Sequence, residues 1–269
     1  MVELKEVSFS FGSRQVLSEI DLTIAPGVIY GLFGQNGAGK TSMLKLVCGS
    51  LFPKTGSVTI LKKDSTERNC SVMSDIFLLP EDIAEYHGSG KSFTRYYAPL
   101  YKKFDYADYH NYLKWFEVDE CDQLHYLSLG AQKKFLLSFA LACNCRLTLL
   151  DEPTNGLDIT SKSILRKVLL AWINDDRAII ISSHQARELN NIVDHVLILR
   201  QHRLVFSDSI AVIQERYNFG HSNHDLKERA LFSKRVPHGF AYISAAEQNG
   251  DSDVDIELLY EAVLTGKVQ

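Results

Sequence analysis

Residues 28–41 read Val-Ile-Tyr-Gly-Leu-Phe-Gly-Gln-Asn-Gly-Ala-Gly-Lys-Thr. The first six residues form an apolar run that predicts a buried strand, and residues 34–41 match the pattern G-x-x-x-x-G-K-[ST]. Gly34, Gly37 and Gly39 let the backbone fold into a nest of N–H groups, toward which the following helix would present its positive end. The segment therefore predicts a phosphate-binding loop between a strand and a helix.

The residues of this loop indicate how it would hold phosphates. Lys40 would neutralise the β and γ phosphates of a nucleotide, and Thr41 would supply a hydroxyl for Mg²⁺, which prefers oxygen ligands. We expect Asn36, Ala38 and Ser42 to complete the contacts with the nucleotide. A glycine-rich turn before an ordinary helix is the alternative, but the four fixed positions would match by chance in roughly one chain in a hundred.

The apolar pattern around the loop predicts the fold class. Residues 2–9 and 16–24 alternate apolar and polar, which favours two antiparallel strands joined through residues 11–13. Continuous apolar runs, separated by helical stretches, occupy residues 28–33, 76–79, 147–150, 178–181 and 196–199. Such runs are typical of a buried parallel sheet. We predict an α/β fold, a P-loop NTPase core with a mainly parallel sheet and an N-terminal antiparallel β subdomain.

An inserted α-helical subdomain is expected at about residues 86–140. Residues 86–116 are rich in aromatic residues at helical spacing, with few strand signals. These rings would form either a small core or a surface that docks a partner, and core packing is the more usual role of aromatic residues spaced three or four apart.

The sequence patterns that indicate helices and strands weaken after about residue 207. One more amphipathic helix is predicted at residues 255–264, with Gly266 as its stop, and the polar residues 247–253 should form a loop. We therefore predict a nucleotide-binding domain at residues 1–210 and a C-terminal accessory segment at residues 211–269.

Composition limits the partners and the compartment. Lys and Arg total 29, Asp and Glu total 33, and the formal net charge of -4 offers no basic field for nucleic acid. Nowhere do about 18 apolar residues run together, so we do not expect the chain to cross a bilayer. The five cysteines are scattered and the first residues lack a signal-peptide pattern, which favours a reducing cytoplasm. Cys143 and Cys145 are expected to be packed thiols rather than zinc ligands.

Two adjacent carboxylates follow the apolar run at residues 147–150. Asp151 and Glu152 would lie at the carboxyl edge of a parallel sheet, where open α/β folds bind ligands. Asp151 would hold Mg²⁺ through a water, and Glu152 would orient and polarise the water that attacks the γ-phosphate. Such a pair can also be a solvated turn, but the phosphate loop upstream favours a site.

The order of motifs in residues 127–158 carries a family resemblance. The segment reads Leu-Ser-Leu-Gly-Ala-Gln-Lys-Lys, an apolar helix, Leu-Leu-Asp-Glu-Pro-Thr and then Asn-Gly-Leu-Asp. With the phosphate loop, it resembles an ATP-binding cassette ATPase over about residues 2–210. The resemblance implies two nucleotide-binding subunits, here a homodimer, that close head to tail around two ATP molecules and Mg²⁺.

The resemblance implies roles for five further residues. Ser128 and Gly130 belong to a signature motif that contacts the γ-phosphate bound in the opposite subunit. Asp158 matches the loop that crosses the dimer interface, and it can also be a helix N-cap. His184 matches the switch histidine that hydrogen-bonds the γ-phosphate. Phe11 matches the aromatic ring that stacks on adenine, with core packing as the alternative.

Two stretches depart from the family pattern. Where the family usually has a glutamine that reaches Mg²⁺ and the attacking water, this chain has Glu81, a carboxylate that we expect at the metal. The signature has Leu129 and Ala131 in place of Gly and Gln, so only the backbone of Gly130 would approach the phosphate closely. Both changes resemble the drug-exporter and antibiotic-resistance branch.

We predict that the chain hydrolyses ATP to drive transport, as export, through separate integral membrane permease subunits, and that it lies on the cytoplasmic face of the membrane. A soluble cassette ATPase that acts on ribosomes or DNA is the alternative, but such proteins typically carry two cassettes or a long coiled coil, and this sequence shows neither. A P-loop kinase or small GTPase disagrees with the signature motif and the switch histidine. The sequence does not indicate the transported substrate.

Overall fold

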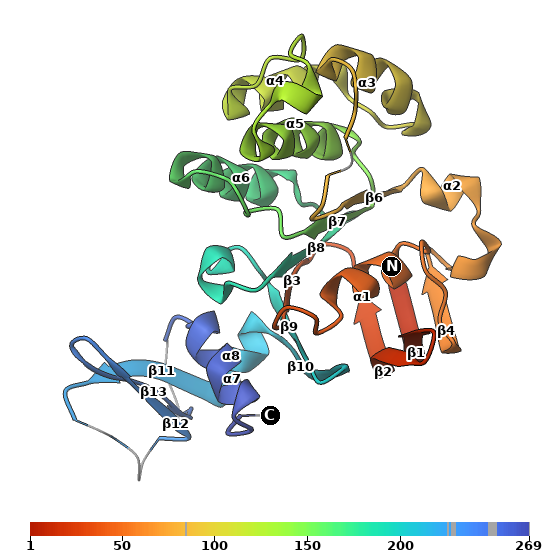
Figure 1. The fold of residues 1–269 in the computed structure, drawn as a ribbon. Helices are drawn as coiled ribbons and strands as arrows, with labels where there is room; N and C mark the ends of the chain where they lie inside the picture. The colour runs from red at the N-terminus through yellow and green to blue at the C-terminus, as the bar shows by residue number, and fades with distance from the viewer. Residues whose placement is uncertain (84, 225, 227–229, 247–251, 269) are drawn as a thin grey trace.

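A computed structural model describes residues 1–83, 85–224, 226, 230–246 and 252–268 of the chain. Within these residues the strands form three β-sheets of six, four and three strands. Figure 1 shows the six-stranded sheet in the middle of the molecule, with helices on both sides and the three-stranded sheet at the C-terminal end.

The central sheet confirms the predicted parallel core. Its order is β10-β9-β3-β8-β7-β6, and all neighbours pair in parallel except β10, which is antiparallel to β9. The strands are β3 (Ile29–Phe33), β6 (Ile76–Leu79), β7 (Leu147–Asp151), β8 (Ala178–Ser183), β9 (His195–Arg200) and β10 (Arg203–Ser209). Every residue of β3, β7 and β8 is buried, which explains why these strands read as continuous apolar runs.

The N-terminal strands form the predicted antiparallel subdomain. The order is β2-β1-β4-β5, with β1 (Val2–Phe11), β2 (Arg14–Ile24), β4 (Thr55–Ile60) and β5 (Lys63–Asp64). Helix α1 (Lys40–Val47) packs with this sheet, because Met43, Leu44 and Val47 share one apolar cluster with β1 and β2. A short 3₁₀ turn, η1 (Ser65–Glu67), and α2 (Cys70–Met73) lead from the subdomain to β6.

Three helices form the predicted helical subdomain above the carboxyl side of β6 and β7 in Figure 1. They are α3 (Gly90–Tyr97), α4 (Tyr106–Phe116) and α5 (Leu129–Ala142), with 3₁₀ turns η2 (Ala98–Leu100) and η3 (Leu124–Tyr126) between them. Phe139 of α5 is buried, and its ring centroid lies 5.1 Å from those of both Phe93 and Phe104. The aromatic segment is therefore mainly a core, although Tyr96, Tyr97, Tyr106 and Trp115 are exposed.

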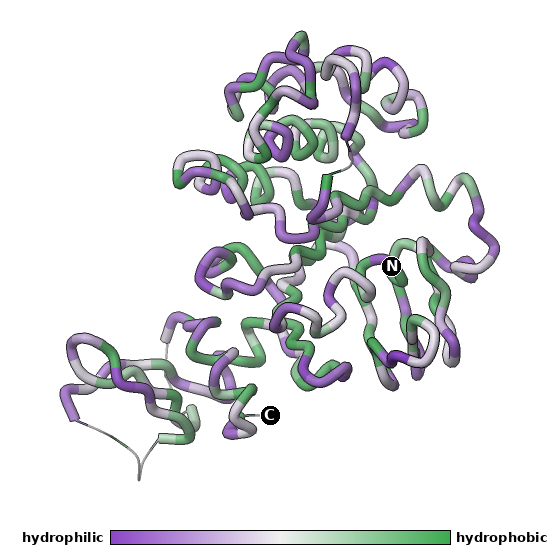
Figure 2. The backbone as a smooth tube through the Cα atoms, in the orientation of Figure 1, coloured by the Kyte–Doolittle hydropathy of each residue, from purple (hydrophilic) through white to green (hydrophobic). Residues whose placement is uncertain are grey.

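Helices α6 (Ile159–Trp172) and α5 cover the same side of the central sheet, and the 3₁₀ turn η4 (Ala186–Leu189) follows β8. Figure 2 shows apolar residues concentrated along the central strands and α5, with polar residues on the outer turns. All five cysteines are free, and Cys143 and Cys145 are buried at the end of α5, which confirms that they are packed thiols.

The C-terminal segment contains more structure than the sequence predicted. Helix α7 (Ile210–Arg216) precedes an antiparallel sheet of order β11-β13-β12, formed by β11 (Tyr217–Ser222), β12 (Phe232–Val236) and β13 (Gly239–Ala245). The predicted last helix is confirmed as α8 (Ile256–Leu264), and Gly266 follows it with a φ of 70°. Residues 247–251 of the predicted polar loop lie outside the described residues. The division of the chain near residue 210 stays a prediction.

Candidate nucleotide-binding site

The phosphate loop joins β3 to α1 and depends on glycine. Gly37 and Gly39 have φ values of 80° and 107°, in the left-handed region that disfavours a side chain. A Cβ on Gly39 would lie 2.9 Å from Leu17 Cδ2 and 3.0 Å from Val16 O, so the loop also lies too close to β2 for one. The predicted strand, loop and helix are confirmed, and α1 begins at Lys40 with its N-terminus at the loop.

Lys40 is held at the loop by two oxygen atoms. Its Nζ donates to Gly34 O at 2.9 Å and lies 3.3 Å from Glu152 Oε1. Lys40 is only 7 % exposed, so its ammonium provides a positive charge that is little screened by water. This position fits the predicted contact with phosphate.

Thr41 and Asp151, which we predicted at the metal, are in direct contact. Thr41 Oγ1 donates to Asp151 Oδ2 at 2.6 Å, and Ser182 Oγ donates to Asp151 Oδ1 at 2.5 Å. Asp151 and Ser182 also pair in register where β7 and β8 end, which brings their side chains together. A hydroxyl and a carboxylate side by side are the hard oxygen donors that Mg²⁺ prefers, so the residues fit this ion.

Glu152 follows β7 in a backbone conformation that is rare for a side-chain-bearing residue. Its φ is 46°, and it is 2 % exposed. Its Oε2 lies 2.9 Å from His184 Nδ1. We assign a proton to Nδ1, because an ionised carboxylate only accepts hydrogen bonds, and in the neutral ring this leaves Nε2 as an acceptor, 3.2 Å from Gln185 Nε2. The structure thus brings Lys40, Glu152 and His184 together.

A cavity of about 440 Å³ gathers the predicted nucleotide contacts of one subunit, a size that suits a small ligand. The predicted site residues that line it are Phe11, Asn36, Gly37, Gly39, Lys40, Thr41, Ser42 and Glu81. Phe11 is 56 % exposed, and its ring meets that of Phe9 edge to face at 4.8 Å, so core packing does not describe it. Glu81 Oε1 lies 3.5 Å from Asn155 Nδ2.

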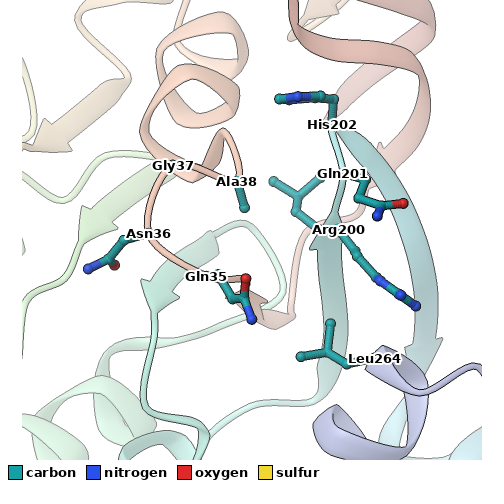
Figure 3. Close-up of a pocket in the computed structure, with 9 residues that line it drawn as sticks. Gln35, Asn36, Gly37, Ala38, Arg200, Gln201, His202 and Leu264 are labelled. Atoms are coloured by element: carbon teal, nitrogen blue, oxygen red, sulfur yellow. The ribbon is translucent and has the colours of Figure 1, made fainter.

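The other side of the phosphate loop borders a second cavity, of about 420 Å³, shown in Figure 3. Gln35 and Ala38 of the loop face the turn between β9 and β10 and Leu264 of α8 across this space, whereas the side chain of Asn36 points away from it. His202 of that turn lines both cavities, and its Nδ1 lies 3.0 Å from Val16 O of β2.

The signature residues Ser128 and Gly130 and the nearby Asp158 are not among the described residues that line the cavity of about 440 Å³, and the same holds for the predicted site residues Gly34, Ala38, Asp151, Glu152 and His184. Ser128 Oγ accepts from Ala131 N at 3.2 Å and so caps α5. A Cβ on Gly130 would lie 2.5 Å from Gly156 O, which requires glycine at this position. The signature therefore packs directly on the loop that precedes Asp158.

Asp158 is the N-cap of α6, which is the second of the two roles that the sequence predicted for it. Its Oδ1 accepts from Ser161 N at 2.8 Å at the start of α6, and its Oδ2 accepts from Lys134 Nζ at 2.9 Å. The Lys134 ammonium and the N–H and hydroxyl of Ser161 hold the pKa of this carboxyl well below its usual range. Asp158 is therefore a fixed negative charge beside the signature helix.

Sequence reasoning missed three residues that support Asp151 and Glu152. Ser182 donates to Asp151 and also accepts from Glu152 N at 3.0 Å. Lys133 Nζ donates to Glu152 O at 2.8 Å, and Asn155 N donates to the same oxygen at 3.2 Å. Helical periodicity could have indicated Lys133, which lies one turn before Leu137 on the buried face of α5.

Comparison with known proteins decides the family. The sequence profile of the family described as "ABC transporter" matches residues 17–155, which include the phosphate loop, the signature motif and the paired carboxylates. The chain belongs to the ABC transporter family.

Relatives and solved structures of ABC proteins agree with this assignment. The chain is 28 % identical over 219 residues to the "ABC transporter ATP-binding protein YtrB" of Bacillus subtilis (strain 168), an alignment that covers 81 % of this chain and 75 % of YtrB. A solved "ATP binding subunit of ABC transporter" superposes with a TM-score of 0.73 at 22 % identity, covering 80 % of this chain and 92 % of that one. The ATP-binding cassette MJ0796, solved as a dimer in a post-hydrolysis state bound to ADP and Pi, gives a TM-score of 0.67 at 19 % identity, covering 78 % of this chain and 98 % of that one.

These likenesses confirm the P-loop NTPase fold and the assignment of the chain as an ABC ATP-binding subunit. Membership of this family supports the prediction that the chain binds and hydrolyses ATP. No helix in the described part of the chain is both long and apolar enough to span a membrane.

Replacement of Phe11 by alanine tests its predicted contact with adenine. The ring is exposed at the cavity rim, so the variant should fold as wild type but bind ATP about 5- to 150-fold more weakly, since base stacking contributes about 1–3 kcal/mol. Isothermal titration with ATP measures the loss, and GTP titration shows whether the ring discriminates bases. Unchanged affinity for ATP would rule out stacking on Phe11.

Proposed function

We propose that this ABC ATP-binding subunit hydrolyses ATP in a head-to-tail homodimer and so drives export through separate membrane-spanning subunits. The observation that carries the proposal is the meeting of Lys40, Glu152 and His184 at one edge of the sheet. The signature residue Ser128 instead caps α5, and it is not among the described residues that line the cavity beside the phosphate loop. Such a chain holds all the groups for hydrolysis, but it needs a second copy to bring them together.

The phosphate loop would bind the triphosphate from one side. Lys40 would exchange its contacts with Gly34 and Glu152 for oxygens of the β and γ phosphates. The loop N–H groups and the start of α1 would hold the remaining phosphate oxygens. The residues proposed for these contacts are Gly34, Asn36, Gly37, Ala38, Gly39, Lys40, Thr41 and Ser42.

Mg²⁺ would be held by Thr41 and Asp151, with Glu81 as a further oxygen donor from the same cavity. Bound there, the ion would neutralise charge on the β and γ phosphates. Ser182 would keep Asp151 oriented, because its hydroxyl already occupies one carboxylate oxygen and leaves the other toward Thr41.

Glu152 and His184 would act on the attacking water. The carboxylate of Glu152 is buried, is oriented by two cationic or imidazole partners, and can accept a proton from water as it attacks the γ-phosphate. His184 would donate a hydrogen bond from Nε2 to the γ-phosphate in its imidazolium form, in which both ring nitrogens carry a proton and Nδ1 still donates to Glu152.

The signature motif of the partner copy would complete each site. Ser128 and the N-terminus of α5 are exposed, and a helix N-terminus of this length favours an anion. Leu129 is 54 % exposed and Ile159, next to Asp158, is 88 % exposed, so this surface offers apolar area to a second copy. The solved dimer of MJ0796, bound to ADP and Pi, supports a dimer here.

A groove between the central sheet and the helical subdomain would receive the membrane subunit. It has a volume of about 320 Å³ and is lined mainly by apolar and aromatic side chains, including Leu79, Ile83, Tyr86, Phe93 and Tyr101. Pro80, which precedes Glu81, also lines it, so a segment bound in the groove would act on the loop that carries a proposed metal ligand. The chain would thus lie on the cytoplasmic face of the membrane.

Replacement of Glu152 by glutamine tests the hydrolytic mechanism. The amide keeps the shape of the side chain but cannot take a proton, so the variant should bind ATP, lower turnover by at least about a hundredfold and accumulate as an ATP-bound dimer. Phosphate release and light scattering measure the two effects. A monomeric variant with wild-type turnover would refute the mechanism.

Co-purification tests the proposed membrane partner. After mild detergent extraction, wild-type chain should elute with an integral membrane protein, and an Ile83→Asp variant should lose that protein but still bind ATP, because the aspartate would be buried in an apolar groove. Leu170→Asp, on the exposed face of α6, is the matched control.

For export, cells that lack the chain should become more sensitive to the transported compound; higher resistance in those cells would indicate uptake.

A further inference from the structure

Lys133 is a fully buried lysine in an unexpected place. It lies on α5 between the signature motif and the aromatic core, and its exposure is 1 %. Lysine is almost never buried to this degree unless its charge is paired. Its Nζ donates to Glu152 O at 2.8 Å, so the ammonium lies directly behind the residue proposed to activate water.

The carbonyl that Lys133 contacts belongs to a strained stretch of backbone. Glu152 adopts a φ of 46°, and its N–H donates to Ser182 Oγ at 3.0 Å while its carbonyl accepts from Lys133 and from Asn155 N. Residues in such conformations persist only where their surroundings hold them. Lys133 is one of the groups that fix the direction in which the Glu152 side chain leaves the sheet.

The Glu152 carbonyl also connects the ammonium, through Asn155, to the exposed carboxylate of Glu81. Asn155, whose N–H shares the Glu152 carbonyl with Lys133, has its side-chain amide 3.5 Å from Glu81 Oε1. Burial lowers the pKa of Lys133, and the negative charges of Glu81, then Glu152, oppose this effect. Glu81 therefore belongs to the electrostatic surroundings of Lys133.

We propose that Lys133 is a positioning residue of the hydrolytic site, which fixes the backbone of Glu152 and supplies the positive charge that offsets the Glu81 carboxylate. The inference rests on the proposed function, since it takes Glu152 as the residue that activates water. It explains how this chain carries a carboxylate at position 81, because an added negative charge beside a polyphosphate is tolerated where a buried cation balances it.

Packing alone gives no reason for lysine at this position. Burying an ammonium costs desolvation free energy that one hydrogen bond to a carbonyl does little more than offset, so selection for the stability of the fold alone would not favour lysine over methionine here. The proposal therefore predicts that the charge serves hydrolysis and not the stability of the fold.

A double-mutant cycle tests this pairing, with Lys133→Met, Glu81→Gln and the two combined. In the wild-type background, which carries Glu81, we expect K133M to lower kcat for ATP hydrolysis by about 10- to 100-fold, because an unbalanced carboxylate then repels the phosphates. In the Glu81→Gln background the same substitution should lower kcat by about threefold or less. Without nucleotide, the Tm of K133M should stay close to that of wild type, because the substitution removes the desolvation cost of the ammonium together with its hydrogen bond to Glu152 O.

Two more variants separate the charge from the fold. Lys133→Gln can still donate to Glu152 O but carries no charge, so it should lose kcat in the wild-type background and recover it more fully than K133M does in the Glu81→Gln background. If K133M fails to fold, Lys133→Gln tests the proposal in its place. Lys114→Met, an exposed lysine of α4, is the matched control and should hydrolyse ATP as wild type does.

Three results would overturn the proposal: equal fold losses in the two backgrounds, wild-type kcat in both Lys133 variants, or a kcat that falls only in step with the Tm. Each of them leaves the Glu152→Gln result untouched. A wild-type rate for Glu152→Gln would instead contradict the proposed function itself, so the two failures can be told apart.

Discussion

The parallel register of β3, β8 and β7 is the constraint on which the rest of the site depends. Phe33 pairs with Ser183, and Asp151 pairs with Ser182, so the three strands end at the same edge of the sheet. The hydrogen bond from Thr41 to Asp151 joins residues that are 110 positions apart in the sequence. The loop after β3, the carboxylates after β7 and the histidine after β8 meet because the strands that carry them are paired in this way.

Buried charge is the second organising feature of the site. Lys40 and Lys133 lie on different sides of Glu152, one at its side chain and the other at its carbonyl, and both are almost inaccessible to water. In such surroundings each charge acts strongly on its neighbours, so the balance of carboxylates and ammonium groups decides whether a polyphosphate is attracted. The substitution at position 81 is best understood within this balance.

Local patterns made much of the fold and half of the site predictable. The phosphate loop and the pair Asp151–Glu152 follow buried strands, and a short motif with a fixed geometry needs no knowledge of distant residues. The three-stranded C-terminal sheet was not predicted, because most residues of β11 and β12 are only partly buried and their sequences lack a clean alternation. The role of the aromatic segment was left open because Phe139, at the centre of that core, comes from a later helix.

The supporting residues of the site could not be predicted for a related reason. A serine near the end of a strand, an asparagine in a turn and a lysine beside a second lysine occur in many sequences, and only the fold places Lys133 of α5 behind Glu152. Ser128 and Asp158 were named from the family resemblance, and in this chain they cap their own helices, so their contact with the nucleotide of a partner copy stays a prediction.

The central claim is that each hydrolytic site combines the phosphate loop of one copy with the signature motif of another. ATP hydrolysis by an equal mixture of Lys40→Ala and Ser128→Asp proteins tests it most directly. Aspartate still caps α5 but sets a negative charge against the γ-phosphate, and alanine removes the ammonium of the loop. Each variant alone should be inactive, and the mixture should regain hydrolysis, because one site of the mixed dimer has both Lys40 and Ser128. Wild-type turnover by Ser128→Asp alone would contradict the claim.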